Sequence, residues 1–302
     1  MKKVLITGFS GLLGSNLAFE FKDRYAIVGQ YNRHRPGIKG VGLLQCDLSS
    51  DFIRKVLDVR PEVIIHTAAL TNVDYCEEHP EETYDINSRS AGDLAKAASS
   101  MGAKIVFIST DSVYRDTPGK AYKEMSSPLD PLNVYSKSKL RGEEMVSGAC
   151  EDYLIIRTTI YGYNYQDKLS LGEWVLYNLG NGKPIKMFDD VFFNPILVND
   201  LASAIYVLIE KDLSGVFNVD SRGSISKYGF GVKIAERFDL DPGLISPVSV
   251  SDHDFTAKRP RNMVSDVSRI LEYADVPTIA QGIEHFRDLY MQEYPQRLKR
   301  GV

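Results

Sequence analysis

Tyr135 and Lys139 have the residue types and the spacing of a proton-donating pair, in the segment N-V-Y-S-K-S-K. If residues 133–149 form a helix, both side chains lie on one face, one turn apart. A nearby ammonium favours the phenolate, which makes a phenol a better acid at neutral pH. Thr110, in the upstream S-T-D, could hold a carbonyl oxygen that Tyr135 protonates while a hydride reaches the carbon. By itself, Tyr-x-x-x-Lys is more typical of a pair on a helix surface, and the motifs around it favour catalysis.

Hydride chemistry needs a cofactor, and glycines near the start of the chain have the spacing of a phosphate loop. Gly8, Gly11 and Gly14 follow an apolar segment and open a helix that begins near Leu12. The first glycine allows a tight turn, the second a close approach to a pyrophosphate, and the third close packing of helix and strand. Free N–H groups at the helix start would bind the phosphates. An ordinary strand–helix turn is the alternative interpretation. Ser10, Leu12 and Leu13 are also expected to contact the cofactor.

The end of the second predicted strand selects between the two nicotinamide cofactors. An acidic residue there would bind the ribose 2′-hydroxyl, but the sequence is Q-Y-N-R-H-R-P, without an acid. Arg33 and Arg35 could pair with a 2′-phosphate, and Asn32 lies between the strand and them. We therefore expect NADPH, with NADH as the alternative. A solvated basic loop is the competing interpretation.

Residues after the later strands complete the predicted cofactor site. Asp47 and Leu48 are placed to meet the adenine. Asn87 could support a proton relay from its helix, although a plain polar helix residue fits equally well. The backbone of a small-residue segment would lie along the cofactor: Ala68, Ala69 and Leu70.

The elements that must position these residues alternate between strand and helix. Predicted strands are 3–7, 26–31, 42–45, 63–67, 104–109 and 153–157. Several are almost continuously apolar, as expected of strands buried on both faces of a parallel sheet. The fold class is therefore α/β: a Rossmann-type doubly wound parallel sheet with a smaller, interleaved C-terminal α/β substrate domain. We expect a dinucleotide-binding domain at 1–157 with a return segment at about 195–220, and a mainly substrate-binding domain at 158–302.

Helical patterns separate and follow these strands. Pro80 lies near the start of one helix, and Gly102 is well placed to end it. Another helix is predicted from 199 to about 211, before a strand V-F-N-V. The tail from 221 is expected to hold two or three short helices.

Composition narrows the classes of function. The chain has 302 residues, with 43% hydrophobic and 25% charged residues and a net charge of −4. No basic field would attract nucleic acid. No apolar segment reaches the roughly 18–20 residues that span a bilayer. The three cysteines and five histidines are scattered, so no metal site is expected. The apolar segment at the N-terminus is too short for a signal peptide, and we expect a cytoplasmic protein.

The order of the motifs carries a resemblance. The segments are T-G-x-x-G-x-x-G, H-T-A-A-L-T-N-V-D, Y-D-I-N, F-I-S-T-D-S-V-Y, P-L-N-V-Y-S-K-S-K, R-G-E and I-I-R-T. Together they resemble the extended short-chain dehydrogenase/reductase superfamily, and V-D-Y-C-E and K-R-P-R-N-M-V-S-D are most similar to its dTDP-4-dehydrorhamnose reductase family. The resemblance implies NADPH-dependent reduction of a 4-keto-6-deoxy sugar carried on a nucleoside diphosphate. It implies Thr110, Tyr135 and Lys139 as the catalytic residues. Members of the superfamily often form dimers, so a homodimer is one expected oligomeric state.

The resemblance also suggests where the nucleotide sugar would bind, and where this chain departs from the family. The family has an aromatic residue where Ser112 follows S-T-D, and a Gln-x-Gly segment followed by Pro-Thr where this chain has F-D-D-V-F-F-N-P-I. Both departures concern the sugar and base pocket. Arg259 could lie near the sugar nucleotide or on a solvated surface, and Tyr161 and Trp174 could stack on it or pack in the core. The other residues expected at the substrate are Thr71, Asp111, Val113 and Asn164.

Other activities remain open within this resemblance. Dehydratases of the superfamily commonly have Asp-Glu after the catalytic threonine, whereas Asp111 is followed by Ser112, which disfavours dehydration. An epimerase would use the same three residues. A nonenzymatic regulatory subunit, similar to the beta subunit of methionine adenosyltransferase, is an alternative of another class.

Overall fold

The centre of the protein is a parallel sheet of seven strands. The structure is a computed structural model that describes residues 1–50 and 52–300. The strand order is β11-β6-β5-β4-β1-β2-β3, and all neighbouring strands are parallel. The strands are β1 (Lys3–Thr7), β2 (Ala26–Tyr31), β3 (Gly42–Gln45), β4 (Val63–His66), β5 (Lys104–Ile108), β6 (Tyr153–Arg157) and β11 (Gly215–Asn218). The predicted Rossmann-type fold is confirmed.

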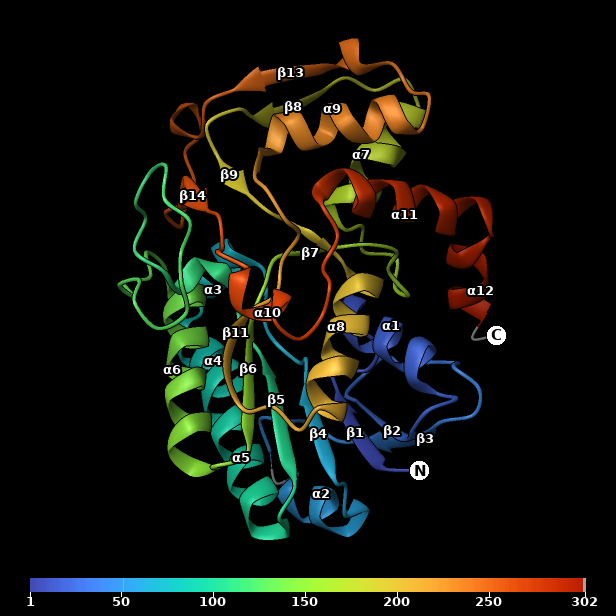
Figure 1. Ribbon diagram of the computed structural model, residues 1–302, viewed down its shortest axis with the longest axis vertical. Coiled ribbons are helices and arrows are strands. Elements are labelled where there is room, and N and C mark those ends of the chain that lie inside the picture. Colours follow the sequence, from blue (N-terminus) through green and yellow to red (C-terminus); the bar gives the residue numbers. More distant parts are fainter. Residues whose placement is uncertain (51, 301–302) are drawn as a thin grey trace.

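Helices cover both faces of this sheet (Figure 1). Side chains alternate along each strand, so that Val4 and Ile6 pack with one group of helices and Leu5 packs with the other. The first group is α1 (Leu12–Phe21) and α8 (Val198–Glu210), and the second is α2 (Ile53–Val59), α5 (Ser90–Met101) and α6 (Val134–Ala149). Burial on both faces explains the continuous apolar strands.

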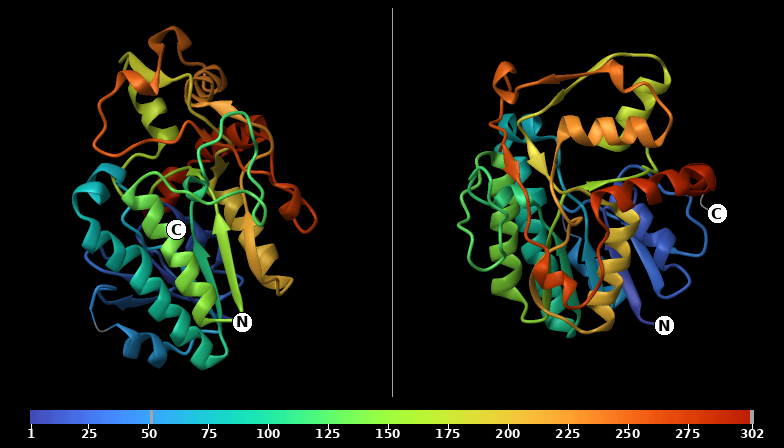
Figure 2. Two further views of the ribbon diagram at one scale, coloured as in Figure 1. Left: turned by 90° about the vertical axis from the view of Figure 1, so that its left-hand side faces the viewer. Right: turned by 45° about the horizontal axis from the view of Figure 1, so that its top comes forward.

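The C-terminal half adds a smaller layer above the carboxyl ends of the strands (Figures 1 and 2). Its core contains Phe193, Phe230 and Phe286. Its strands are β7 (Ile160–Tyr161), β8 (Ile185–Phe188), β9 (Phe192–Phe193), β10 (Ile196–Leu197), β12 (Ile225–Ser226), β13 (Ile245–Val248) and β14 (Asn262–Met263). Its helices are α7 (Leu171–Gly180), α9 (Lys227–Arg237), α11 (Ile279–Met291) and α12 (Tyr294–Arg300), whereas α10 (Ser268–Leu271) packs on the sheet core beside β11. The predicted tail of two or three short helices underestimates this content, since α9 and α11 are each at least three turns long.

The segment between β4 and β5 differs from the single helix that Pro80 and Gly102 suggest. It contains α3 (Val73–Glu78), α4 (Pro80–Tyr84) and a π-helical turn (Asp85–Arg89) before α5. Gly102 ends α5 in the left-handed conformation, with φ of 64°. The π turn contains Asn87, and such turns occur often at functional sites.

The chain returns from the C-terminal layer to the sheet. β11 pairs with β6, so Gly215 lies beside Leu154 and Asn218 lies beside Arg157. The division into two domains stays a prediction. No helix in residues 1–50 and 52–300 is long and apolar enough to cross a membrane.

Candidate functional site

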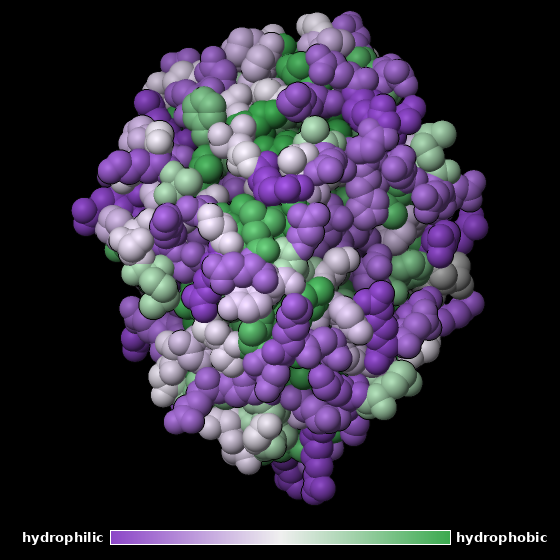
Figure 3. Space-filling view, in the orientation of Figure 1, coloured by the Kyte–Doolittle hydropathy of each residue, from purple (hydrophilic) through white to green (hydrophobic). Residues whose placement is uncertain are grey.

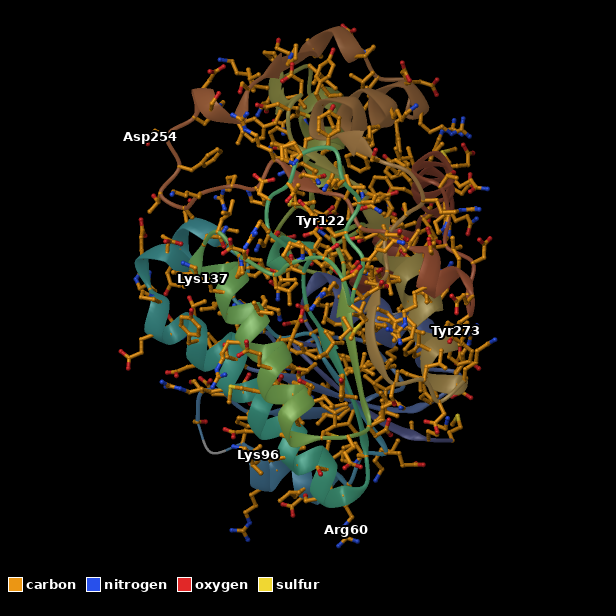
Figure 4. All side chains as sticks on the ribbon, turned by 60° about the vertical axis from the view of Figure 1, so that its left-hand side comes forward. Arg60, Lys96, Tyr122, Lys137, Asp254 and Tyr273 are labelled. Atoms are coloured by element: carbon orange, nitrogen blue, oxygen red, sulfur yellow. The ribbon has the colours of Figure 1, made fainter. Side chains whose placement is uncertain are left out.

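A cleft of about 860 Å³ opens above the carboxyl ends of the central strands. It begins between the neighbouring strands β1 and β4, from which the chain continues towards opposite edges of the sheet. Ligands of doubly wound sheets usually bind at such a point. Figure 3 shows apolar residues recessed among hydrophilic ones across the middle of the molecule. Arg60 and Lys96 mark the opposite end of the molecule in Figure 4. The sequence-predicted residues that line the cleft are Gly8, Ser10, Gly11, Leu12, Leu13, Asn32, Arg33, Asp47, Leu48, Ala68, Ala69, Leu70, Thr71, Thr110, Asp111, Ser112, Tyr135, Lys139, Tyr161 and Asn164.

The glycine loop is bare because neighbouring backbone leaves no room for side chains. Gly8 has φ of 63°, and a Cβ on it would lie 2.6 Å from the Ala68 nitrogen. A Cβ on Gly14 would lie 2.5 Å from the Gly8 oxygen, so this glycine packs the helix against the loop and does not line the cleft. Gln30 holds the loop from below, accepting a hydrogen bond from the Gly8 N–H at 3.1 Å. Its own amide donates to the Cys46 carbonyl at 2.7 Å.

The two arginines after β2 differ in position. Arg33 lines the cleft, whereas Arg35 is exposed and lies outside the lining. Beside Arg33, the Asn32 amide donates to Asp47 Oδ2 at 3.1 Å, which joins the ends of β2 and β3. The Ser49 backbone and side chain hold the pKa of Asp47 below its usual range. Asp47 is therefore a carboxylate, while Arg33 offers a positive charge at the cleft edge.

Thr110 follows β5 and caps a short 3₁₀ helix, Asp111–Val113. Its oxygen accepts a hydrogen bond from the Ser112 N–H at 3.2 Å, and its hydroxyl donates to Asp111 Oδ1 at 3.1 Å. The cap fixes the side chain at the cleft, but the hydroxyl must turn from Asp111 before it can donate to a ligand.

Tyr135 and Lys139 lie on the cleft side of α6, as their spacing predicted. Burial raises the pKa of the Tyr135 phenol, the Asp111 carboxylate raises it further, and the Thr110 hydroxyl lowers it. Burial lowers the pKa of Lys139 to about 7, against the opposing effect of Glu143. The expected lowering of the phenol pKa is therefore outweighed by burial in this structure.

Asp111 belongs to a buried pair of acids beneath the cleft. The Thr159 hydroxyl donates to Asp111 Oδ2, and the Thr159 N–H donates to Asp220 Oδ1 at 2.9 Å. Burial raises the pKa of Asp111, and burial together with Asp111 raises that of Asp220 far above its usual range. Burial and the neighbouring Asp111 carboxyl therefore both favour the protonated form of Asp220.

Three contacts fix the orientation of α6. Asn133 caps its start, accepting a hydrogen bond from the Ser136 N–H at 2.9 Å, and its amide donates to the Lys258 carbonyl at 2.9 Å. Farther along, the Glu143 carboxylate accepts hydrogen bonds from Arg157 on β6, at 3.0 Å from Nε and 2.6 Å from Nη2. Lys137, on the outer side of α6, is exposed (Figure 4).

Asn87 does not line the cleft, but it supports two parts that do. Its Oδ1 accepts from the Leu70 N–H at 2.8 Å, and its amide donates to the Leu70 carbonyl and the Ser138 hydroxyl, each at 3.0 Å. The π turn brings this amide between the segment after β4 and α6. Asn87 thus connects the cofactor side of the cleft to the helix that carries Tyr135.

The residues expected at the substrate divide into two groups. Thr71, Asp111, Ser112, Tyr161 and Asn164 line the cleft, although Tyr161 is only 1% exposed and packs edge-on against Phe230 and Phe286.

The remaining three lie elsewhere. Val113 is buried with Tyr114 and Tyr122, and Trp174 packs against the core of the C-terminal layer. Arg259 pairs with Asp74 at 2.6 Å and is outside the lining.

The structure also reveals cleft residues that no sequence pattern indicated. Lys227 lines the cleft at the start of α9, and Lys168 lines it from the segment before α7, donating to the Thr71 hydroxyl at 3.4 Å. A single lysine in a loop has no spacing pattern that separates it from a surface residue. Among the described residues, no three His, Cys, Asp or Glu side chains form a group that could hold a metal ion.

Comparison with known proteins gives consistent similarities. The family model for the RmlD substrate binding domain matches residues 1–288. The probable low-salt glycan biosynthesis reductase Agl14 of Haloferax volcanii is 31% identical over 271 residues, 88% of this chain and 90% of that protein. The methionine adenosyltransferase 2 subunit beta of Bos taurus is 31% identical over 289 residues, 89% of this chain and 81% of that protein. A crystal structure of dTDP-4-dehydrorhamnose reductase from Bacillus anthracis, in complex with NADP, has a TM-score of 0.84 and 29% identity, covering 95% of this chain and 99% of that chain.

Proposed function

This chain belongs to the RmlD substrate-binding-domain family, within the extended short-chain dehydrogenase/reductase superfamily, and we propose that it uses NADPH to reduce the C4 ketone of a nucleotide-linked sugar. Its reductase relatives make it an oxidoreductase that acts on a sugar. The 4-keto-6-deoxy sugars on dTDP are the first substrates to test. The regulatory alternative and the epimerase alternative are judged by the same experiment.

One observation carries the proposal: a single cleft is lined by both the glycine loop and the side chains of Thr110, Tyr135 and Lys139. Nucleotide binding alone would need only the loop. Carbonyl reduction also needs a proton donor and a group that holds the oxygen, and these stand together at the far end of the same cleft.

The residues present fit a dinucleotide. The close approach of Gly8 to Ala68 leaves backbone without side chains at the phosphate position, and α1 starts directly behind it. Arg33 suits the 2′-phosphate that distinguishes NADPH from NADH. When bound, NADPH would supply the hydride.

Side chains of this protein would bind the ketone oxygen of the substrate and donate a proton to it. Thr110 turns its hydroxyl from Asp111 to the ketone oxygen, which holds the carbonyl in place. Tyr135, whose raised pKa keeps it protonated in the free protein, donates its proton as the oxygen gains charge. Lys139 places a positive charge behind the phenol when it is protonated, and would hold the nicotinamide ribose.

The test is NADPH oxidation by the purified protein with dTDP-4-dehydro-6-deoxy-L-mannose, compared with Tyr135→Phe. The wild type should oxidise NADPH, and Tyr135→Phe should reduce the rate by about 100-fold or more because the proton donor is lost. Tyr177→Phe, an exposed tyrosine on α7, is the matched control and should keep the wild-type rate.

Three outcomes would contradict the proposal. Equal rates in the wild type and Tyr135→Phe would remove the phenol from the chemistry. Tight NADPH binding without turnover of any 4-keto sugar nucleotide would favour the regulatory alternative. Interconversion of two sugar nucleotides without net NADPH loss would favour the epimerase.

A further inference from the structure

Lys227 lines the cleft, and neither the proposed chemistry nor a neighbouring acid accounts for its charge. It is the first residue of α9, directly after β12, and its side chain is half-buried in the cleft wall. No carboxylate oxygen of a described residue lies within the 4.0 Å of Nζ that would define an ion pair. Lys227 Nζ lies 5.9 Å from the centroid of the Phe188 ring, a contact that gives little compensation for lost water.

The charges that surround Lys227 do not neutralise it. Arg259, which disfavours a positive charge on Lys227, already has Asp74 as its partner at 2.6 Å. Asp111 attracts Lys227, but its oxygens accept hydrogen bonds from the hydroxyls of Thr110, Ser112 and Thr159. A partly desolvated ammonium without an ion-pair partner is unfavourable, so a ligand anion at this place would gain a charge-assisted interaction.

The position of Lys227 is at the reacting end of the cleft. Asp111 directly follows Thr110, and the Ser112 hydroxyl contacts Met263 Sδ at 3.6 Å in the same wall. The Ser112 side chain is small, and its hydroxyl donates to Asp111 Oδ1 at 3.1 Å. Lys227 lines the same cleft as Thr110 and Ser112, so its charge is available to an anionic group of a ligand there.

We propose that Lys227 binds a carboxylate on the sugar ring of the nucleotide-linked substrate. The inference rests on the proposed reduction of a nucleotide-linked keto sugar, and it changes the expected sugar from a neutral deoxy sugar to one that carries a carboxylate. Burial and Arg259 lower the pKa of Lys227, and a carboxylate beside it would favour the ammonium again. Lys227 acts in recognition and takes no part in proton transfer.

The test measures binding and does not depend on turnover. UDP-glucuronate and UDP-glucose differ only by a carboxylate in place of a hydroxymethyl group, so the nucleoside and the diphosphate cancel in the comparison. Calorimetry in the presence of saturating NADP⁺ would give both affinities for the wild type, Lys227→Met and Lys227→Arg. Lys233→Met, an exposed lysine on the same helix, is the matched control.

The wild type and Lys233→Met should bind UDP-glucuronate about tenfold or more tightly than UDP-glucose. Lys227→Met should bring the two affinities to within about twofold, and Lys227→Arg should keep part of the preference. Unchanged NADP⁺ affinity in Lys227→Met would show that the fold is intact.

Three results would overturn the inference. The first is a wild type that binds UDP-glucuronate and UDP-glucose equally, and the second is a preference for UDP-glucuronate that survives in Lys227→Met. The third is an equal loss of UDP-glucuronate, UDP-glucose and UDP binding in Lys227→Met, which would assign the lysine to the diphosphate. If the wild type does not bind UDP-glucuronate at millimolar concentration, the inference is overturned as well. Failure of the proposed reduction is separate, because it would show as an unaffected rate in Tyr135→Phe while these affinities stay as expected.

Discussion

The Glu143 carboxylate lies 2.6 Å from Nη2 of Arg157, and both side chains are at most 5% exposed. Glu143 is on α6, which carries Tyr135 and Lys139, and Arg157 ends β6. Arg157 Nη1 also donates to the Tyr114 hydroxyl at 3.0 Å, and this hydroxyl donates to Asn218 on β11 at 2.8 Å. Helix α6 is therefore tied to the sheet and to the segment that returns from the C-terminal layer.

Glu143→Gln should lower the free energy of unfolding by about 3 kcal/mol or more, because it leaves the Arg157 guanidinium buried without its counterion. Urea unfolding checks this change. Glu144→Gln is the matched control, since Glu144 pairs with Arg141 on the surface and its loss should cost less than about 1 kcal/mol. Similar effects for both variants would show that the buried pair does not stabilise α6.

Gly142→Ala should destabilise the protein by about 1–3 kcal/mol, although alanine is the better helix former. A Cβ at position 142 would lie 2.7 Å from both the backbone carbonyl oxygen of Asn87 and Cζ of Phe107. The added methyl group would push α6 away from the π turn, so NADPH oxidation should fall as well.

Gly148→Ala, in the last turn of the same helix, is the control for Gly142→Ala. Nothing lies within 4 Å of its Cβ position, and alanine there should stabilise the protein by up to about 1 kcal/mol. Thermal or urea unfolding of both variants measures the two changes in stability. A stabilised Gly142→Ala would contradict the close packing of α6 on the π turn.

Arg33→Ala should weaken NADPH binding by about tenfold and leave NADH binding unchanged, because only NADPH carries the 2′-phosphate. Fluorescence titration with each cofactor measures this difference. Arg35→Ala has the same change of charge outside the cleft, so it should have little effect on either cofactor. If Arg35→Ala instead loses NADPH preferentially, the phosphate is held by the outer part of the loop.

Stability should fall in acid partly through His66. Burial lowers the pKa of His66 from 6.5 to about 3, with Thr7 Oγ1 at 2.7 Å from its Nδ1. The unfolded chain binds a proton below about 6.5, while the folded chain does so only near 3. The neutral imidazole therefore contributes stability that is complete above 6.5 and is lost as the pH falls towards 3, by up to about 1.4 kcal/mol per pH unit.

His66→Gln should make the free energy of unfolding less dependent on pH between 4 and 6.5, even if the variant is less stable overall. Urea unfolding across this range, for wild type and variant, measures the slope. His253→Gln, at an exposed position, should retain the wild-type slope. An unchanged slope in His66→Gln would mean that His66 is protonated in the folded protein.

The parts of the site that the sequence predicted depend on local patterns. The glycine loop and the pair Tyr135 and Lys139 are set by spacing within one turn or one helix, and the strands by continuous apolar segments. Lys227 reaches the cleft from a distant segment, and Asp220 lies beneath it, and no local pattern places either residue there.

Burial also separates residues that look equivalent in the sequence. Ser112 and Val113 are neighbours, but the 3₁₀ turn after Thr110 directs one to the cleft and the other into a cluster with Tyr114 and Tyr122. Trp174 is aromatic, as a stacking residue would be, yet its helix packs it on the core. Only the tertiary arrangement distinguishes these roles.

Asn133 caps α6 and also holds the Lys258 carbonyl, and Asp74 binds the Ala257 N–H at 3.0 Å and the Arg259 guanidinium. The starts of α6 and α3 therefore share their contacts with a segment from the last sixth of the chain. A chimera that replaced the C-terminal half with that of a relative would disturb the start of α6, unless the partners of Asn133 and Asp74 were carried over with it. The two halves of this protein are not interchangeable modules.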